Sequence, residues 1–191
     1  VITTHSDFPS TYGLGSSSAT VAAMLFGLTR LFGLSLAPDE LFALGLDAVR
    51  RVQRLGSGYD LASAIYGGTL FYDNARPRQI LPLNTPDLPL VVAYSGVKAD
   101  TPTYIQRVTE RLGRLPDAVN GIFDVMAHVV KDARCTLQDG DWPGLGELMD
   151  IQHGLVHALG VDTEKTARLV FAAREAGAYG AKQAARAVAT A

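Results

Sequence analysis

The chain has 191 residues, of which 48% are hydrophobic and 19% are charged, with 17 basic residues against 19 acidic ones. This composition is typical of a folded globular protein and excludes a disordered chain. The formal net charge of −2 offers no positive field for nucleic acid, and no apolar run is long enough for a membrane span. A single cysteine, Cys135, excludes an internal disulfide framework and favours a cytoplasmic location.

The first half of the chain alternates between helical and β-type patterns. Apolar residues recur at helical spacing until Gly33, and Pro38 opens a second helix that has acids in its first turn and arginines in its last. Later segments are β-prone and separated by turn residues. In chain order we expect a strand at 1–5, followed by helices at 19–32 and 37–55. A glycine loop with a short helix follows at 56–68, and then three strands at 69–73, 78–83 and 88–94.

The second half is helical. Apolar residues recur with helical period in four segments, over residues 101–112, 116–138, 143–158 and 162–176. A mixed part followed by a helical part favours the α+β class, with a boundary near residues 84–100. We therefore expect two domains, at 1–84 and 85–191.

The stretch GLGSSSA, residues 13–19, places two glycines and three serines at the start of the first helix. Glycines let the backbone approach a ligand, and the N–H groups of a helix N-terminus favour an anion such as phosphate. Serine hydroxyls add hydrogen-bond donors and an oxygen ligand for Mg²⁺, for which we name Ser17. An ordinary glycine turn with a serine cap is an equally good interpretation of this loop alone.

The same stretch resembles the phosphate-binding motif of the GHMP kinases, Pro-x-x-x-Gly-Leu-Gly-Ser-Ser-Ala, with Ser18 inserted as a third serine. Pro9 matches the motif's first position. The resemblance implies that the nucleotide is bound by Gly13, Leu14, Gly15, Ser16, Ser17, Ser18 and Ala19.

A second loop, GSGYDLASAIYGG at 56–68, resembles the Ser-Gly-x-Asp loop of the mevalonate-kinase branch of that family. The resemblance implies that Asp60 is the catalytic base, or orients the attacking hydroxyl. From the residues alone, an aspartate at this position is as often a helix cap as a base.

Other candidates carry less weight. The resemblance makes Lys98 a cation for a substrate carboxylate or phosphate, although a lysine in a turn is more often simply exposed. His153 and His157 lie four residues apart on one helix, but no metalloprotease pattern surrounds them, and we interpret them as packing or surface residues. Cys135, alone on a helix, is interpreted as inert.

The chain also departs from the family pattern. We expect the family's N-terminal segment, which bears a lysine, to lie before residue 1. At the position of the family's magnesium-binding glutamate stands Val49, and Asp47 is a candidate substitute. The expected Gly-rich loop is replaced by residues 183–191, which we interpret as a frameshifted reading of a glycine-rich segment.

Together these features predict an α+β, GHMP kinase-type fold. Its N-terminal part would be an incomplete α/β domain of the ribosomal-protein-S5-domain-2-like type, and its C-terminal part helix-rich and ferredoxin-like. The resemblance implies an ATP- and Mg²⁺-dependent kinase of mevalonate or a similar hydroxy acid, a small-molecule substrate, and no nucleic-acid or membrane partner. A homodimer is left open. The alternatives are a phosphomevalonate kinase, a sugar kinase of the same superfamily, or a non-catalytic nucleotide-binding remnant.

Overall fold

The computed structural model describes residues 3–7, 9–53, 56–96 and 101–184. The chain divides into two compact units, Val1–Leu83 and Asn84–Ala191. Each of them has its own cluster of buried apolar side chains.

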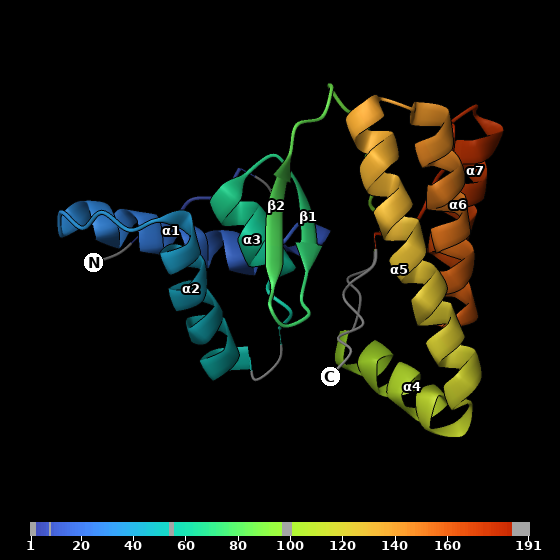
Figure 1. Cartoon of the computed structure of the whole chain (residues 1–191), viewed down its shortest axis with the longest axis horizontal. Coiled ribbons are helices and arrows are strands. Elements are labelled where there is room, and N and C mark those ends of the chain that lie inside the picture. The colour runs from blue at the N-terminus through green and yellow to red at the C-terminus, as the bar shows by residue number, and fades with distance from the viewer. Residues whose placement is uncertain (1–2, 8, 54–55, 97–100, 185–191) are drawn as a thin grey trace. The chain divides into compact units, whose positions relative to one another are not determined.

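The first unit packs helices against a short β-hairpin (Figure 1). Its elements are η1 (Ser10–Tyr12), α1 (Ser16–Leu31), α2 (Pro38–Gln53), α3 (Tyr59–Tyr66), β1 (Thr69–Asp73) and β2 (Gln79–Leu83). The two strands are antiparallel, and Phe71 is paired with Leu81 at the centre of the ladder. Helix α3 packs on α1 and α2 and also contacts β1, so it lies between the other helices and the hairpin.

Helix α2 illustrates how the local sequence defines an element. Proline at the first helical position needs no hydrogen-bond acceptor. The Glu40 carboxylate accepts a hydrogen bond of 2.7 Å from the backbone N–H of Ala37, which closes the N-terminus. Further along the helix, apolar side chains at helical spacing are buried, at Leu41, Phe42, Leu46 and Val49. This stripe holds α2 against the rest of the unit.

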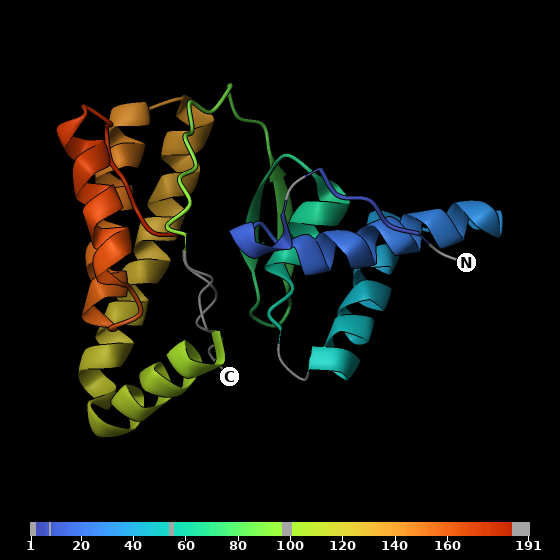
Figure 2. The same ribbon diagram turned by 180° about the vertical axis from the view of Figure 1, so that it is seen from behind.

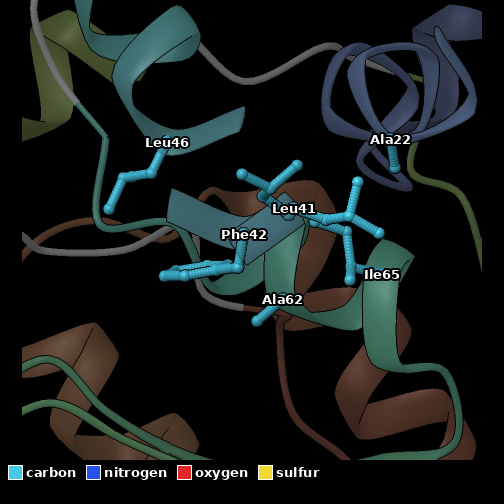
Figure 3. Packing of buried hydrophobic residues seen from close by; sticks show 7 residues of the cluster. Ala22, Leu41, Phe42, Leu46, Ala62 and Ile65 are labelled. Carbon is cyan, nitrogen blue, oxygen red and sulfur yellow. The ribbon is translucent and has the colours of Figure 1, made fainter. Parts of the chain in front are cut away.

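The core of the first unit is formed where α1, α2 and α3 meet (Figure 3). Its buried members are Ala22, Leu41, Phe42, Leu46, Leu61, Ala62 and Ile65. The helices approach closely at Gly45, where a Cβ atom would lie 2.9 Å from Cδ2 of Leu61 and 3.1 Å from Cδ1 of Leu25. A glycine at this position therefore permits the observed helix spacing.

The second unit is helical, as Figure 2 shows from behind. Its helices are α4 (Thr101–Arg114), α5 (Pro116–Asp139), α6 (Trp142–Ala158) and α7 (Glu164–Glu175). In both views α5, α6 and α7 lie side by side, and α4 packs on α5. The Thr163 side chain caps α7 in a reciprocal arrangement with Thr166.

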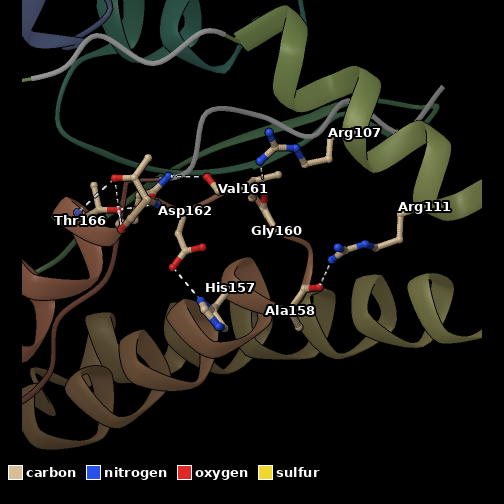
Figure 4. A network of polar contacts seen from close by, with 10 residues as sticks. Arg107, Arg111, His157, Ala158, Gly160, Val161, Asp162 and Thr166 are labelled. Atoms are coloured by element: carbon tan, nitrogen blue, oxygen red, sulfur yellow. Dashed lines mark hydrogen bonds and ion pairs between the residues drawn. The ribbon is translucent and has the colours of Figure 1, made fainter.

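Two arginines of α4 bind the C-terminal end of α6 (Figure 4). Arg107 Nη1 donates a hydrogen bond of 3.0 Å to the Gly160 carbonyl, and Arg111 donates to the Ala158 carbonyl. These carbonyls lie at the end of the helix, where backbone acceptors lack intrahelical partners. Directly beside them lies the second core, formed by Val108, Val119, Val156, Leu159 and Val161.

The segment that follows α7 lies directly on α6. A Cβ atom on Gly146 would be 2.4 Å from the carbonyl carbon of Tyr179, and one on Gly180 would be 1.9 Å from the Gly146 oxygen. Further along α6, the Asp150 carboxylate accepts a hydrogen bond of 3.0 Å from the Ala181 backbone N–H. This contact between two backbones requires glycine on both sides.

Two of the expected strands are wrong. Residues 88–94 form no strand, and Val91 is 91% exposed. A strand needs a neighbour for its backbone groups, and the described part of residues 84–184 contains none. Residues 3–5 are likewise irregular, while residues 1 and 2 lie outside the described part.

Among the described residues, no helix has the length and apolar character needed to cross a lipid bilayer.

Candidate functional site

The glycine–serine loop forms a tight turn at the start of α1. After η1, Gly13 and Gly15 adopt left-handed backbone conformations, with φ of 76° and 72°. Glycine adopts this region without the penalty that a side chain brings. Gly15 is the N-cap of α1 and contributes no side chain to the helix end. The predicted loop is therefore built as a turn that exposes backbone at a helix N-terminus.

This helix end is suited to an anion. The first N–H groups of an α-helix have no acceptor within the helix, and the macrodipole places partial positive charge there. The Gly15 carbonyl accepts the first helical hydrogen bond, of 3.0 Å, from the Ala19 N–H. The first turn of α1 contains no acidic residue that would compete with an anionic ligand. A phosphate at this position would meet both the N–H groups and the dipole.

The three serines differ in their surroundings. The Oγ atom of Ser16 is buried and has no hydrogen-bond partner in the structure. Ser18 is half-buried, and Ser17 is exposed. A buried hydroxyl without a partner costs free energy, so Ser16 is the serine whose environment is best explained by a ligand.

Asp60 lies against this loop. It is in the first turn of α3, whose N-cap, Gly58, has φ of 92°. A Cβ atom built on Gly15 would be 3.5 Å from Cβ, Cγ and Oδ1 of Asp60. The Asp60 side chain therefore lies next to the backbone turn that precedes the serines. The fold brings together the two glycine loops, which are far apart in the sequence.

Other residues of the predicted site occupy different environments. Leu14 is 51% exposed, and Ala19 is also exposed. Lys98, the expected cation for the substrate, lies outside the described residues. None of these observations tests a role in binding, and their assignments stay predictions.

Asp47, the candidate substitute for the metal-binding glutamate, forms an ion pair on the surface of α2. Its carboxylate is 2.7 Å from Nε of Arg51 on the same helix, and both side chains are largely exposed. Val49, the residue at the expected position, is buried. The described chain contains no group of three or more histidine, cysteine, aspartate or glutamate residues that could hold a metal ion.

The remaining oxygen donors nevertheless fit Mg²⁺ that arrives with a nucleotide. Mg²⁺ prefers hard oxygen ligands and is commonly bound through one or two carboxylates together with substrate phosphates. The Ser16 hydroxyl without a partner and the nearby Asp60 carboxylate provide this chemistry. Ser17, the ligand named from the sequence, lies in the same helical turn.

Sequence reasoning missed the residues that support the Asp60 loop. The Tyr72 hydroxyl on β1 donates a hydrogen bond to the Ser57 carbonyl, immediately before Gly58. The pKa of Tyr72 is raised, mainly by burial, although the positive charges of Arg78 and Arg50 act in the opposite direction. In the sequence Tyr72 is one aromatic residue in a short strand, and no local pattern signals a contact with a loop.

The two histidines of α6 have different roles, neither of them in a metal cluster. His153 is 8% exposed, its Nδ1 atom has no hydrogen-bond partner, and burial lowers its pKa. His157 is exposed, and its Nδ1 atom lies 2.8 Å from Oδ2 of Asp162 (Figure 4). Cys135 is an exposed free cysteine on α5.

Comparison with known proteins identifies relatives for most of the chain. Residues 1–68 match the model of the GHMP kinases N-terminal domain. Mevalonate kinase from Pyrococcus horikoshii is 38% identical over 182 residues, which are 93% of this chain and 53% of that protein. Mevalonate kinase from Thermococcus sibiricus is 37% identical, over 93% of this chain and 54% of that protein. The chain thus spans about half the length of the curated relatives it matches.

A solved structure shares the fold as well. The crystal structure of L. major mevalonate kinase in complex with R-mevalonate matches with a TM-score of 0.81 and 30% sequence identity. The match covers 91% of this chain and 54% of that one. The similarity therefore extends well beyond the two glycine loops.

Proposed function

This chain belongs to the GHMP kinase superfamily and has its fold, and on that premise we propose that it transfers the γ-phosphoryl group of ATP to mevalonate or a similar small hydroxy acid. The position of Asp60 next to Gly15 is the observation that carries the proposal. It puts an acid beside a helix N-terminus suited to phosphate, as phosphoryl transfer requires. The relatives named as mevalonate kinases support mevalonate as the acceptor.

In this proposal the loop from Gly13 to Ala19 binds the phosphates of the nucleotide. Its backbone N–H groups donate to phosphate oxygens, and the dipole of α1 stabilises their negative charge. The Ser16 hydroxyl, which is buried without a partner, donates to the same group. Negative charge on the phosphate oxygens is redistributed in the transition state of the transfer. Hydrogen-bond donors that are already in place stabilise this charge most effectively.

Mg²⁺ would be held through a serine hydroxyl of this turn, Ser16 or Ser17, together with the phosphate oxygens. When bound, the ion neutralises charge on the phosphates. The chain itself fixes the donor oxygens, because Ser16 and Ser17 belong to the first turn of α1.

Asp60 is the proposed base for the acceptor hydroxyl. The hydroxyl oxygen forms a bond to the γ-phosphorus while the bond from that phosphorus to the bridging oxygen breaks, and ADP leaves with the electron pair. The proton of the hydroxyl passes to the Asp60 carboxylate. Because α3 is anchored in the core by Leu61 and Ala62, the carboxylate is held in position before the substrate binds.

A coupled assay of ADP release with mevalonate tests this role. We expect Asp60→Asn to lower kcat by about a hundredfold to ten-thousandfold, the usual contribution of a general base. As a matched control, Asp73→Asn changes a carboxylate at the end of β1 that accepts a hydrogen bond from the Ala75 N–H. Its kcat should equal that of the unmodified chain, and full activity in Asp60→Asn would contradict the proposal.

The acceptor is determined by the same assay run with phosphomevalonate, homoserine and galactose. If the chain phosphorylates one of these compounds and not mevalonate, it is a kinase of that acceptor within the same superfamily. Binding of ATP without turnover of any acceptor would instead support a non-catalytic nucleotide-binding role. We also propose a cytoplasmic location, supported by the single cysteine.

A further inference from the structure

We propose that Tyr72 is a positioning residue, whose hydroxyl fixes the loop before α3 and thereby holds the Asp60 carboxylate in its place next to Gly15. The inference rests on the function proposed above for Asp60. Tyr72 itself lies on β1, in the hairpin, and acts through the backbone of residues 57 and 58.

The first step is the contact between the tyrosine and the loop. The Tyr72 hydroxyl donates to the Ser57 carbonyl. At the next residue, a Cβ atom on Gly58 would lie 3.1 Å from the Tyr72 hydroxyl oxygen, 3.1 Å from Cζ of Phe42 and 3.0 Å from Cδ1 of Leu46. The loop backbone is thus packed tightly against the tyrosine and two core side chains.

The second step is the orientation of the tyrosine ring. Its edge packs on Phe42, with the ring centroids 6.4 Å apart and the planes at 63°. The guanidinium of Arg78, on the turn before β2, lies 5.3 Å from the centroid of the Phe42 ring. Arg78 also donates to Oδ1 of Asn74, which lies 3.4 Å from the Tyr72 hydroxyl. The orientation of the hydroxyl is therefore fixed by Phe42 of α2 and by Asn74 of the hairpin turn.

The third step connects the loop with the carboxylate. Gly58 is the N-cap of α3, and its carbonyl accepts a hydrogen bond of 2.9 Å from the Ala62 N–H. Asp60 lies between these two residues in the same turn. A shift of the backbone at residues 57 and 58 therefore moves the first turn of α3. Displacements of about 1 Å at a reacting group can lower a rate by about a hundredfold.

The test is Tyr72→Phe, which removes the hydroxyl and keeps the ring. We expect kcat with mevalonate to fall by about tenfold with little change in KM for ATP, because the phosphate loop is untouched. In the Asp60→Asn background the same change should have no further effect on kcat, since a residue that acts through Asp60 loses its influence with it. A merely structural role would lower activity equally in both backgrounds.

The matched control is Tyr66→Phe. Tyr66 is the last residue of α3, at the end remote from Asp60, and its hydroxyl donates a hydrogen bond to Asp39 of α2. We expect the kcat of this variant to be unchanged. Equal losses of kcat in the two tyrosine variants would overturn the inference.

Amide hydrogen exchange decides the inference independently of activity. In Tyr72→Phe, exchange of the Ala62 amide, which donates to the Gly58 carbonyl, should rise severalfold, while that of the Ala19 amide, which donates to the Gly15 carbonyl in α1, stays constant. Unchanged exchange of the Ala62 amide would overturn the inference. If the unmodified chain turns over no acceptor, or Asp60→Asn is fully active, the proposed function fails, and the exchange data still decide whether Tyr72 fixes the loop.

Discussion

At the scale of single residues, the buried histidine His153 makes the stability of the fold depend on pH. Burial is the main cause of its lowered pKa. Asp162 and Asp150 act in the opposite direction, while His157 and Arg174 lower the pKa further. In the unfolded chain the imidazole keeps an ordinary pKa of about 6.5. Between that value and the lower folded pKa, the unfolded state therefore binds a proton that the folded state does not.

We expect the free energy of unfolding to decrease as the pH falls below about 6.5, the ordinary pKa of histidine. In His153→Gln this decrease should be smaller, because the titrating group is gone. The control His128→Gln changes an exposed histidine on α5 and should follow the pH profile of the unmodified chain. Urea unfolding at a series of pH values measures the effect, and identical profiles for all three proteins would contradict it.

The candidate site was predictable from the sequence to an unequal extent. The glycine–serine loop could be named as an anion site from its residues, whereas the role of Asp60 came from the resemblance of its loop to the Ser-Gly-x-Asp loop of the GHMP kinases. That Asp60 lies next to Gly15 could not be derived, since this depends on how α1 and α3 pack. Tyr72 was missed for the same reason, because its partner Ser57 is on a loop and no periodic pattern joins them.

At the scale of elements, periodicity predicted the helices within a few residues of their ends. The largest difference is in the first helix, which begins at Ser16, three residues before the expected residue 19. Serines read as loop residues but are also good first-turn residues. The segment 88–94 was wrong for another reason. Its β-prone residues have the composition of a strand, but pairing depends on a neighbouring strand and not on composition.

The contact of the segment after α7 with α6 gives a sharp prediction at this scale. In Gly146→Ala the new methyl group would overlap the Tyr179 carbonyl, so this segment must move. We expect a loss of about 1–3 kcal/mol in the free energy of unfolding, the usual cost of overpacking.

A glycine on the same helix provides the control for this experiment. A Cβ atom on Gly154 would meet nothing within 4 Å. Gly154→Ala should therefore gain up to about 1 kcal/mol from helix propensity alone. Urea denaturation compares the two variants, and a similar change of the same sign in both would show that the contact at Gly146 is unimportant.

On the scale of the whole molecule, the chain consists of two units with separate buried clusters. The proposed phosphate loop, Asp60 and Tyr72 all belong to the first unit. The stability of its core is therefore expected to control the site directly. Leu61, which is 1% exposed and adjacent to Asp60, is the residue that tests this connection.

We expect Leu61→Ala to lower the free energy of unfolding of the first unit by about 2–5 kcal/mol, as other leucine-to-alanine changes in cores do. Amide exchange should accelerate most strongly in α1, α2 and α3. The counterpart Leu159→Ala, in the second core, should accelerate exchange most strongly in α4, α5 and α6. The same exchange pattern in both variants would contradict the assignment of two cores.

The glycine at the middle of α2 has a consequence for how this molecule can vary. A Cβ atom at Gly45 would lie 2.9 Å from Cδ2 of Leu61 and 3.1 Å from Cδ1 of Leu25, so this position of α2 packs on both the helix that begins with the serines and the helix that bears the acid. Any larger side chain would press on both leucines, and the three helices would have to repack around it. A substitution inside the core can thus disturb the helices that carry both loops, at a residue that no ligand would touch.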